Sequence, residues 1–115
     1  MGTWGTAPYD NDEAADWIAE VFAPTAIDQH IEDALKYDDT FGKALAAAYL
    51  ICQLGHSPYV WPGDLELLDG HIQRVLDRLQ EMAKPDSEYM GLTGNDPDFK
   101  NSIEDQIAAL KKLQD

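Results

Sequence analysis

Residues 64–84 read DLELLDGHIQRVLDRLQEMAK, and the spacing of their apolar side chains decides the fold class. These side chains recur three and four positions apart along the whole stretch. They are Leu65, Leu68, Ile72, Val75, Leu76, Leu79, Met82 and Ala83. That period is typical of an amphipathic α-helix with one face in a core. Gly63 or Asp64 is expected to start the helix, and Lys84-Pro85 to end it.

The same period predicts four more helices and one short helical turn. The helices are 10–23, 26–37, 40–54 and 96–114, and the turn is 86–91. Residues 44–52 are apolar almost all round, which indicates a helix with neighbours on several sides, and Gly55 is expected to follow its end. No segment shows the period-two alternation of a strand.

Helix starts are marked by residues whose side chains accept hydrogen bonds from free backbone N–H groups. We expect Asp10 or Asn11 to cap the first helix and Thr25 to cap the second. Asp96 followed by Pro97 predicts the start of the last helix. Proline has no backbone N–H, and at the first helical position this costs no hydrogen bond, because an N–H there has no partner within the helix.

The chain has 115 residues, which suits one domain. Residues 1–9 hold Trp4, Tyr9, two glycines and a proline, which predicts an irregular arm whose aromatic rings dock on the body. In the first helix, Trp17 is expected to enter the core. The sequence therefore predicts one all-α domain over residues 1–115, a compact bundle of five or six helices with an irregular N-terminal arm.

The chain is strongly acidic, and the acidity is concentrated near its start. Lys and Arg total 8 and Asp and Glu total 22, so the formal net charge is −14. Residues 1–35 contain eight acids and no Lys or Arg, whereas residues 74–115 contain nine acids and six bases. Such a field repels nucleic acid and anionic membranes, neither of which we expect as a partner, and it attracts basic proteins. The alternative is that the acidity only keeps the protein soluble.

Other whole-chain features favour an intracellular protein. Cys52 is the single cysteine, so no intramolecular disulfide forms, and we expect its side chain to be buried as a small hydrophobe. The chain lacks an apolar run of about 18 residues, as a membrane-spanning helix needs. Its start also lacks the basic and apolar parts of a secretion signal. These observations predict a cytoplasmic protein.

Carboxylates on the first predicted helix form the candidate partner-binding site. Asp12, Asp16 and Glu20 are spaced four apart and share one helix face, with Glu13 beside them. A solvated stripe is one interpretation, and a divalent-cation or acid–base site is another. A calcium loop of the EF-hand type is excluded, because its central glycine and final glutamate are missing.

The rest of the chain shows no catalytic motif. Its histidines lack the paired spacing of a zinc site. They are His30, His56 and His71. His56 adjoins Ser57 in the loop 55–63, but a Ser-His pair adjacent in sequence is not the signature of a catalytic triad. The plainer interpretation is that this loop packs on the core through Tyr59 and Trp61. We expect no catalytic residue, no metal site and no cofactor.

The opening of the chain has a distinctive order of glycine, aromatic and acidic residues. Residues 2–17 read GTWGTAPYDNDEAADW. This order resembles the bacterial family called domain of unknown function 4259, whose members open with Met-Gly, a Trp-Gly, an aromatic residue, Asn-Asp, Ala and Asp-Trp. The chain departs from that pattern at Ala7-Pro8, where glycine is common, and at Tyr9, where Phe is common. Looser similarity in residues 44–48, 86–88 and the last helix extends the resemblance, which implies a small bacterial protein and no known activity.

Two functions are consistent with these observations. The first is a non-enzymatic protein-binding module, immunity-like or regulatory, that holds a basic protein on its acidic N-terminal half. The alternative is a small metal-dependent hydrolase that uses carboxylates together with the histidines. Self-association into a homo-oligomer also stays open.

Overall fold

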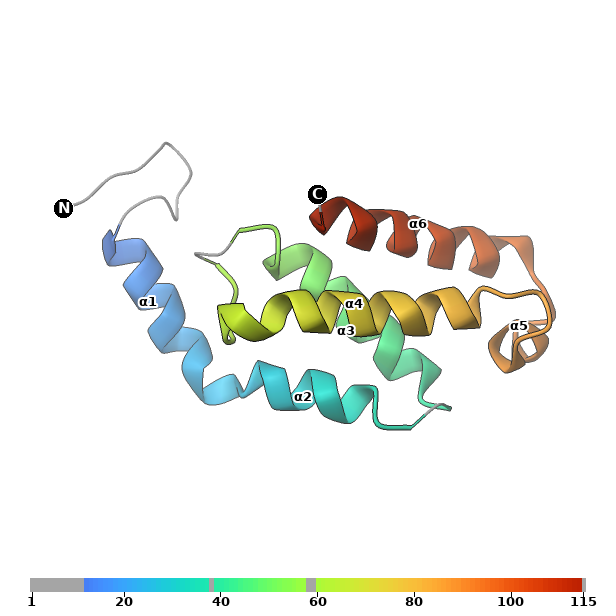
Figure 1. Ribbon diagram of the computed structural model, residues 1–115, viewed down its shortest axis with the longest axis horizontal. Helices are drawn as coiled ribbons and strands as arrows, with labels where there is room; N and C mark the ends of the chain where they lie inside the picture. The colour runs from blue at the N-terminus through green and yellow to red at the C-terminus, as the bar shows by residue number, and fades with distance from the viewer. Residues whose placement is uncertain (1–11, 38, 58–59, 115) are drawn as a thin grey trace.

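The computed structural model describes residues 12–37, 39–57 and 60–114, and within them every regular element is helical. The elements are α1 (Asp12–Phe22), the short 3₁₀ helix η1 (Ala23–Thr25), α2 (Ile27–Ala34), α3 (Phe41–Leu54), α4 (Leu65–Met82), α5 (Glu88–Leu92) and α6 (Pro97–Leu113). The predicted all-α class and the predicted number of helices are confirmed (Figure 1).

The alanine-rich helix α3 has neighbours on several sides, as its sequence predicts. It packs against α2, α4 and α6, and the last two also pack on each other. Ala44 and Ala48 are fully buried, and their short side chains let neighbouring helices approach closely. The helix ends at Leu54, directly before Gly55. The other core residues are Ile31, Ala34, Leu35, Ala47, Ile51, Trp61, Leu68, Ile72, Val75, Leu76, Leu79, Met82, Tyr89, Met90, Ile103 and Leu110.

The predicted start signals of α4 and α6 are confirmed. The Asp64 carboxylate accepts a hydrogen bond from the Glu66 N–H at 2.9 Å, and the Asp96 carboxylate accepts one from the Asp98 N–H at 2.8 Å. Each bond satisfies an N–H group that the first helical turn leaves without an intrahelical partner. Pro97 occupies the first position of α6.

The bounds of α2 differ from the prediction. Thr25 belongs to η1 and does not cap α2, because its hydroxyl donates to the Phe22 carbonyl at 2.6 Å. The helix instead starts after Ala26, whose φ of 51° lies in the left-handed region. It ends at Ala34, three residues earlier than predicted, where the Thr40 hydroxyl donates to the Ala34 carbonyl at 2.9 Å.

The prediction that Trp17 enters the core is wrong. Its side chain is 63% exposed, and no residue of α1 is buried. Pro24 ends α1 and turns the chain, so α1 stands at one end of the molecule and is inclined to the other helices (Figure 1). Ala14, Ile18 and Phe22 are half-buried, so the apolar stripe of α1 is only partly covered.

Several predictions concern residues outside the described parts of the chain. They are the arm 1–9 with Trp4 and Tyr9, the cap at Asp10 or Asn11, and the position of Tyr59. The extent of the domain over residues 1–115 likewise stays a prediction. Among the residues that the structure describes, no helix is long and apolar enough to cross a membrane.

Candidate functional site

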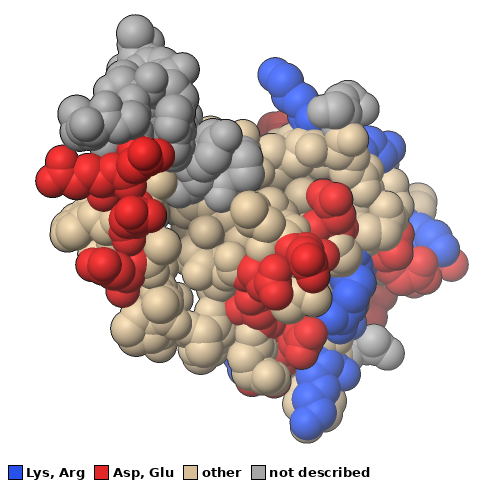
Figure 2. Space-filling model, turned by 60° about the vertical axis from the view of Figure 1, so that its left-hand side comes forward, with Lys and Arg blue, Asp and Glu red and all other residues tan. Residues whose placement is uncertain are grey.

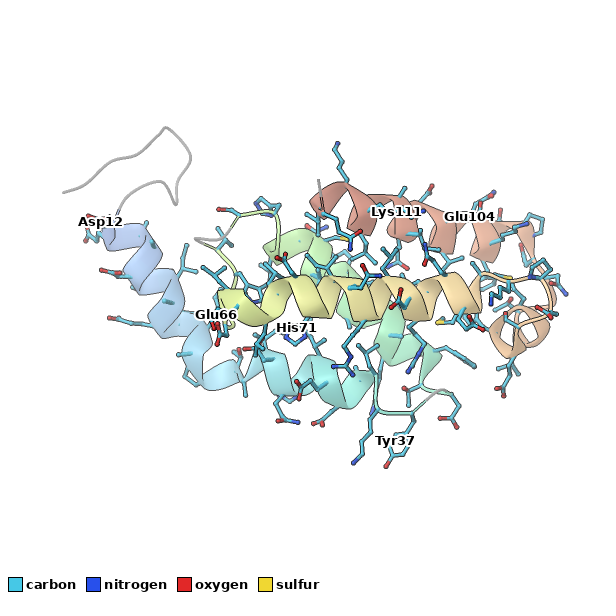
Figure 3. All side chains as sticks on the ribbon, viewed as in Figure 1. Asp12, Tyr37, Glu66, His71, Glu104 and Lys111 are labelled. Atoms are coloured by element: carbon cyan, nitrogen blue, oxygen red, sulfur yellow. The ribbon has the colours of Figure 1, made fainter. Side chains whose placement is uncertain are left out.

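The four carboxylates of the predicted binding site lie on one exposed side of α1. Asp12, Asp16 and Glu20 follow one another at intervals of about one turn, with Glu13 beside them, and all four are exposed. Figure 2 shows acidic side chains in a column along α1, and Figure 3 places Asp12 at its outer end. Because α1 contains no basic residue, carboxylates four apart repel one another by about 0.2–0.5 kcal/mol per pair. A basic partner would relieve this repulsion.

Two exposed apolar side chains border the carboxylates. At about 3.6 residues per turn, Trp17 and Val21 lie between the acidic stripe and the half-buried side of the helix. Trp17 is 63% exposed and Val21 is 46% exposed. This part of α1 therefore combines negative charge with apolar contact area. We call it the α1 face, and it consists of Asp12, Glu13, Asp16, Trp17, Glu20 and Val21.

A second polar cluster, which joins α2 to α4, was missed in the sequence. Nε2 of His71 lies 2.8 Å from Oδ1 of Asp28, and Oδ2 of Asp28 accepts a hydrogen bond from the Asp64 N–H at 2.9 Å. The His71 side chain is 3% exposed and that of Asp28 is 25% exposed. Figure 3 shows His71 on the side of α4 that faces α2. The Trp61 ring packs beside the imidazole, with ring centroids 6.3 Å apart. The carboxylate thus supplies the partner that a buried imidazole needs.

The other end of α2 is also tied to α4. The Arg78 guanidinium donates to the Leu35 carbonyl at 2.7 Å and to the Tyr37 carbonyl at 2.9 Å. Polar contacts therefore hold both ends of α2 on α4, and Ile31 is buried between them. Because η1 links α1 to the start of α2, these contacts hold in place the part of the molecule to which α1 is attached.

The other residues considered for catalysis do not form a site with recognisable chemistry. His30 and His56 are exposed, whereas Ser57 is 7% exposed. Within the described parts of the chain, no three His, Cys, Asp or Glu side chains are grouped so that they could hold a metal ion. Among these residues, the carboxylates of the α1 face are therefore not part of a metal-binding group that includes a histidine.

Cys52 is half-buried against the core, and this burial raises the pKa of its thiol. The reactive thiolate is therefore scarcer at neutral pH than in an exposed cysteine. We expect iodoacetamide to alkylate the folded protein about tenfold more slowly than the same chain in concentrated urea, as measured by mass spectrometry. Equal rates in the two conditions would show that the thiol is not protected by the fold.

Comparison with known proteins supplies a family. The family model described as Domain of unknown function (DUF4259) matches residues 2–113. The chain belongs to this family. The match confirms the resemblance of the opening residues and includes the whole of α1 in the DUF4259 region. No curated protein and no solved structure matches the chain.

Proposed function

We propose that this DUF4259 protein is a non-enzymatic protein-binding module, immunity-like or regulatory, of the bacterial cytoplasm, and that it holds a basic protein on the α1 face. The observation that carries the proposal is the combination of four exposed carboxylates with exposed Trp17 and Val21 on a helix that has no buried residue. Carboxylates alone would also suit a solvated surface, so the apolar side chains beside them are decisive.

The carboxylates supply steering and selectivity. The net charge of −14 attracts a basic partner over a distance of about 8–10 Å at ordinary salt, and it disfavours acidic partners. Each exposed ion pair contributes only about 0–1 kcal/mol, because water screens it and both side chains lose freedom. Four such pairs, at Asp12, Glu13, Asp16 and Glu20, together contribute about 1–4 kcal/mol, and they also determine which protein binds.

The apolar side chains supply affinity. Tryptophan is enriched among the residues that dominate interface energies, and truncating such a residue costs about 2 kcal/mol or more. Covering the exposed part of Trp17 and of Val21 removes apolar surface from water. The aliphatic stems of Lys or Arg side chains suit this role, because they can pack on an indole ring while their charged ends reach the carboxylates.

The alternative, a small metal-dependent hydrolase, would need grouped metal ligands, and the described residues contain no such group. The paired His71 and Asp28 are the nearest approach to acid–base machinery, but the His71 side chain is only 3% exposed. The α1 face therefore carries the proposal.

The test starts from partners that an immobilised chain retains from a bacterial lysate and releases along a salt gradient. A variant with Asp12→Asn, Glu13→Gln, Asp16→Asn and Glu20→Gln is then compared with the unchanged chain. We expect it to bind the purified partner at least about tenfold more weakly, and Trp17→Ala to have an effect of the same size. Isothermal titration calorimetry measures both affinities.

A matched control removes four exposed acids elsewhere, through Glu88→Gln, Asp98→Asn, Glu104→Gln and Asp105→Asn. This variant has the same net charge as the α1 variant. We expect it to keep most of the affinity. If the control loses as much affinity as the α1 variant, or if the α1 variant loses none, the α1 face is not the binding site.

A further inference from the structure

A groove between α2 and α3 belongs neither to the α1 face nor to the Asp28–His71 pair. Its volume is about 370 Å³. Buried Ile31, Ala34 and Ala47 contribute to its lining, and the rest of its apolar part consists of Ile27, Ala46 and Leu50. The Leu50 side chain is 39% exposed, so the groove opens to the surface beside an apolar residue.

The surface of α3 beside this groove differs in charge from the rest of the molecule. Helix α3 contains no Asp or Glu over its 14 residues, and its one charged residue is Lys43. By contrast α1, α2, α4 and α6 all contain acids. α3 also presents Tyr49, whose side chain is 59% exposed. A second chain of the same negative charge therefore meets less repulsion on the α3 side of the groove than on the α2 side, where the helix contains Asp28, Glu32 and Asp33 and no Lys or Arg.

The charged residues that line the groove have opposite signs. Asp33 lies on the α2 side and Lys43 on the α3 side. Lys43 forms no ion pair with the described residues of its own chain. A two-fold axis through the groove would bring Lys43 of each copy to Asp33 of the other, so the groove is complementary to itself in charge.

We propose that two copies of the chain associate through this groove, about a two-fold axis, with Leu50 of each copy seated in the groove of the other. This inference does not depend on the proposed function, because the groove and the α1 face share no residue. The resulting dimer would present two α1 faces, which would strengthen binding to a partner that offers two sites.

Sedimentation equilibrium over about 1–300 µM chain tests this proposal. We expect the apparent mass to rise from the chain mass of 12.8 kDa towards twice that value. Leu50→Glu is expected to raise the dimer dissociation constant at least about tenfold, because it places charge in an apolar contact. The matched control is Leu92→Glu, at a leucine that is 70% exposed and does not line the groove, and we expect it to dimerise like the unchanged chain.

A charge exchange tests the pairing across the axis. Lys43→Glu should weaken the dimer, and Lys43→Glu combined with Asp33→Lys should restore it, with circular dichroism confirming that each variant is folded. A monomeric mass at every concentration, equal dimerisation of Leu50→Glu and the unchanged chain, or no restoration by the charge exchange would overturn the proposal.

Discussion

We expect the Leu79→Ala variant to lose about 2–5 kcal/mol of unfolding free energy. Leu79 is 0% exposed, and it lies on α4, which packs against both α3 and α6. Truncation removes buried apolar surface and leaves a cavity that close-packed neighbours fill only in part. Because a domain of this kind is stable by only about 5–15 kcal/mol, the loss is a large fraction of the total. Urea unfolding followed by circular dichroism measures it.

Leu92→Ala is the matched control for this measurement. It removes the same atoms from a leucine that is 70% exposed, and we expect its unfolding free energy to change by no more than about 0.5 kcal/mol. If the two variants were equally stable, α4 would not be the core helix that its apolar period and its burial indicate.

The second large effect concerns the pair that joins α2 to α4. Asp28→Ala should lower the free energy of unfolding by about 1–3 kcal/mol, because it leaves the buried His71 imidazole without its partner. It also removes the acceptor of the Asp64 N–H. The partial exposure of Asp28 to water, 25%, keeps the cost below that of breaking a fully buried ion pair. Thermal and urea unfolding both report this change.

Two further variants test this pair, the first against a general effect of charge and the second through the space beside Asp28. Glu32→Ala removes an exposed acid from the same helix, and we expect it to leave stability nearly unchanged. Gly63→Ala should destabilise the fold, since its Cβ would lie 2.5 Å from Oδ1 of Asp28, which His71 and Asp64 hold in place. Equal stability of Asp28→Ala and Glu32→Ala would show that the pair contributes nothing.

Local patterns predicted most of the fold. The apolar period of residues 64–84 and the Asp96-Pro97 signal gave α4 and α6, because both depend on neighbours within one or two turns. Residues 44–52 likewise indicated that α3 packs against several other helices. These signals are carried by the segment itself and need no knowledge of the tertiary structure.

Predictions failed where the outcome depends on what lies beside a segment. Thr25 is a good capping residue by type, but it lies in η1, where its hydroxyl donates to the Phe22 carbonyl instead of capping α2. Trp17 fits an apolar stripe, but whether a stripe is covered depends on the neighbouring helices, and none covers this side chain. Because Trp17 is exposed, it forms part of the α1 face.

The Asp28–His71 pair could not be predicted from spacing. The two residues are 43 positions apart, and His71 stands within the apolar stripe of α4 without an acid of matching period nearby. One signal was available in the sequence, namely a polar residue at a position that the helical period places in the core. Such a residue needs a hydrogen-bond partner, and the candidates were the acids of other helices.

The salt dependence of partner affinity tests the α1 face most directly. For the unchanged chain, we expect the dissociation constant to rise about tenfold or more between about 0.05 and 0.5 M sodium chloride, because salt screens the exposed ion pairs. The variant that replaces Asp12, Glu13, Asp16 and Glu20 by amides should bind weakly and show little dependence on salt. An equal affinity and an equal salt dependence for the two proteins would contradict the assignment of the α1 face as the binding surface.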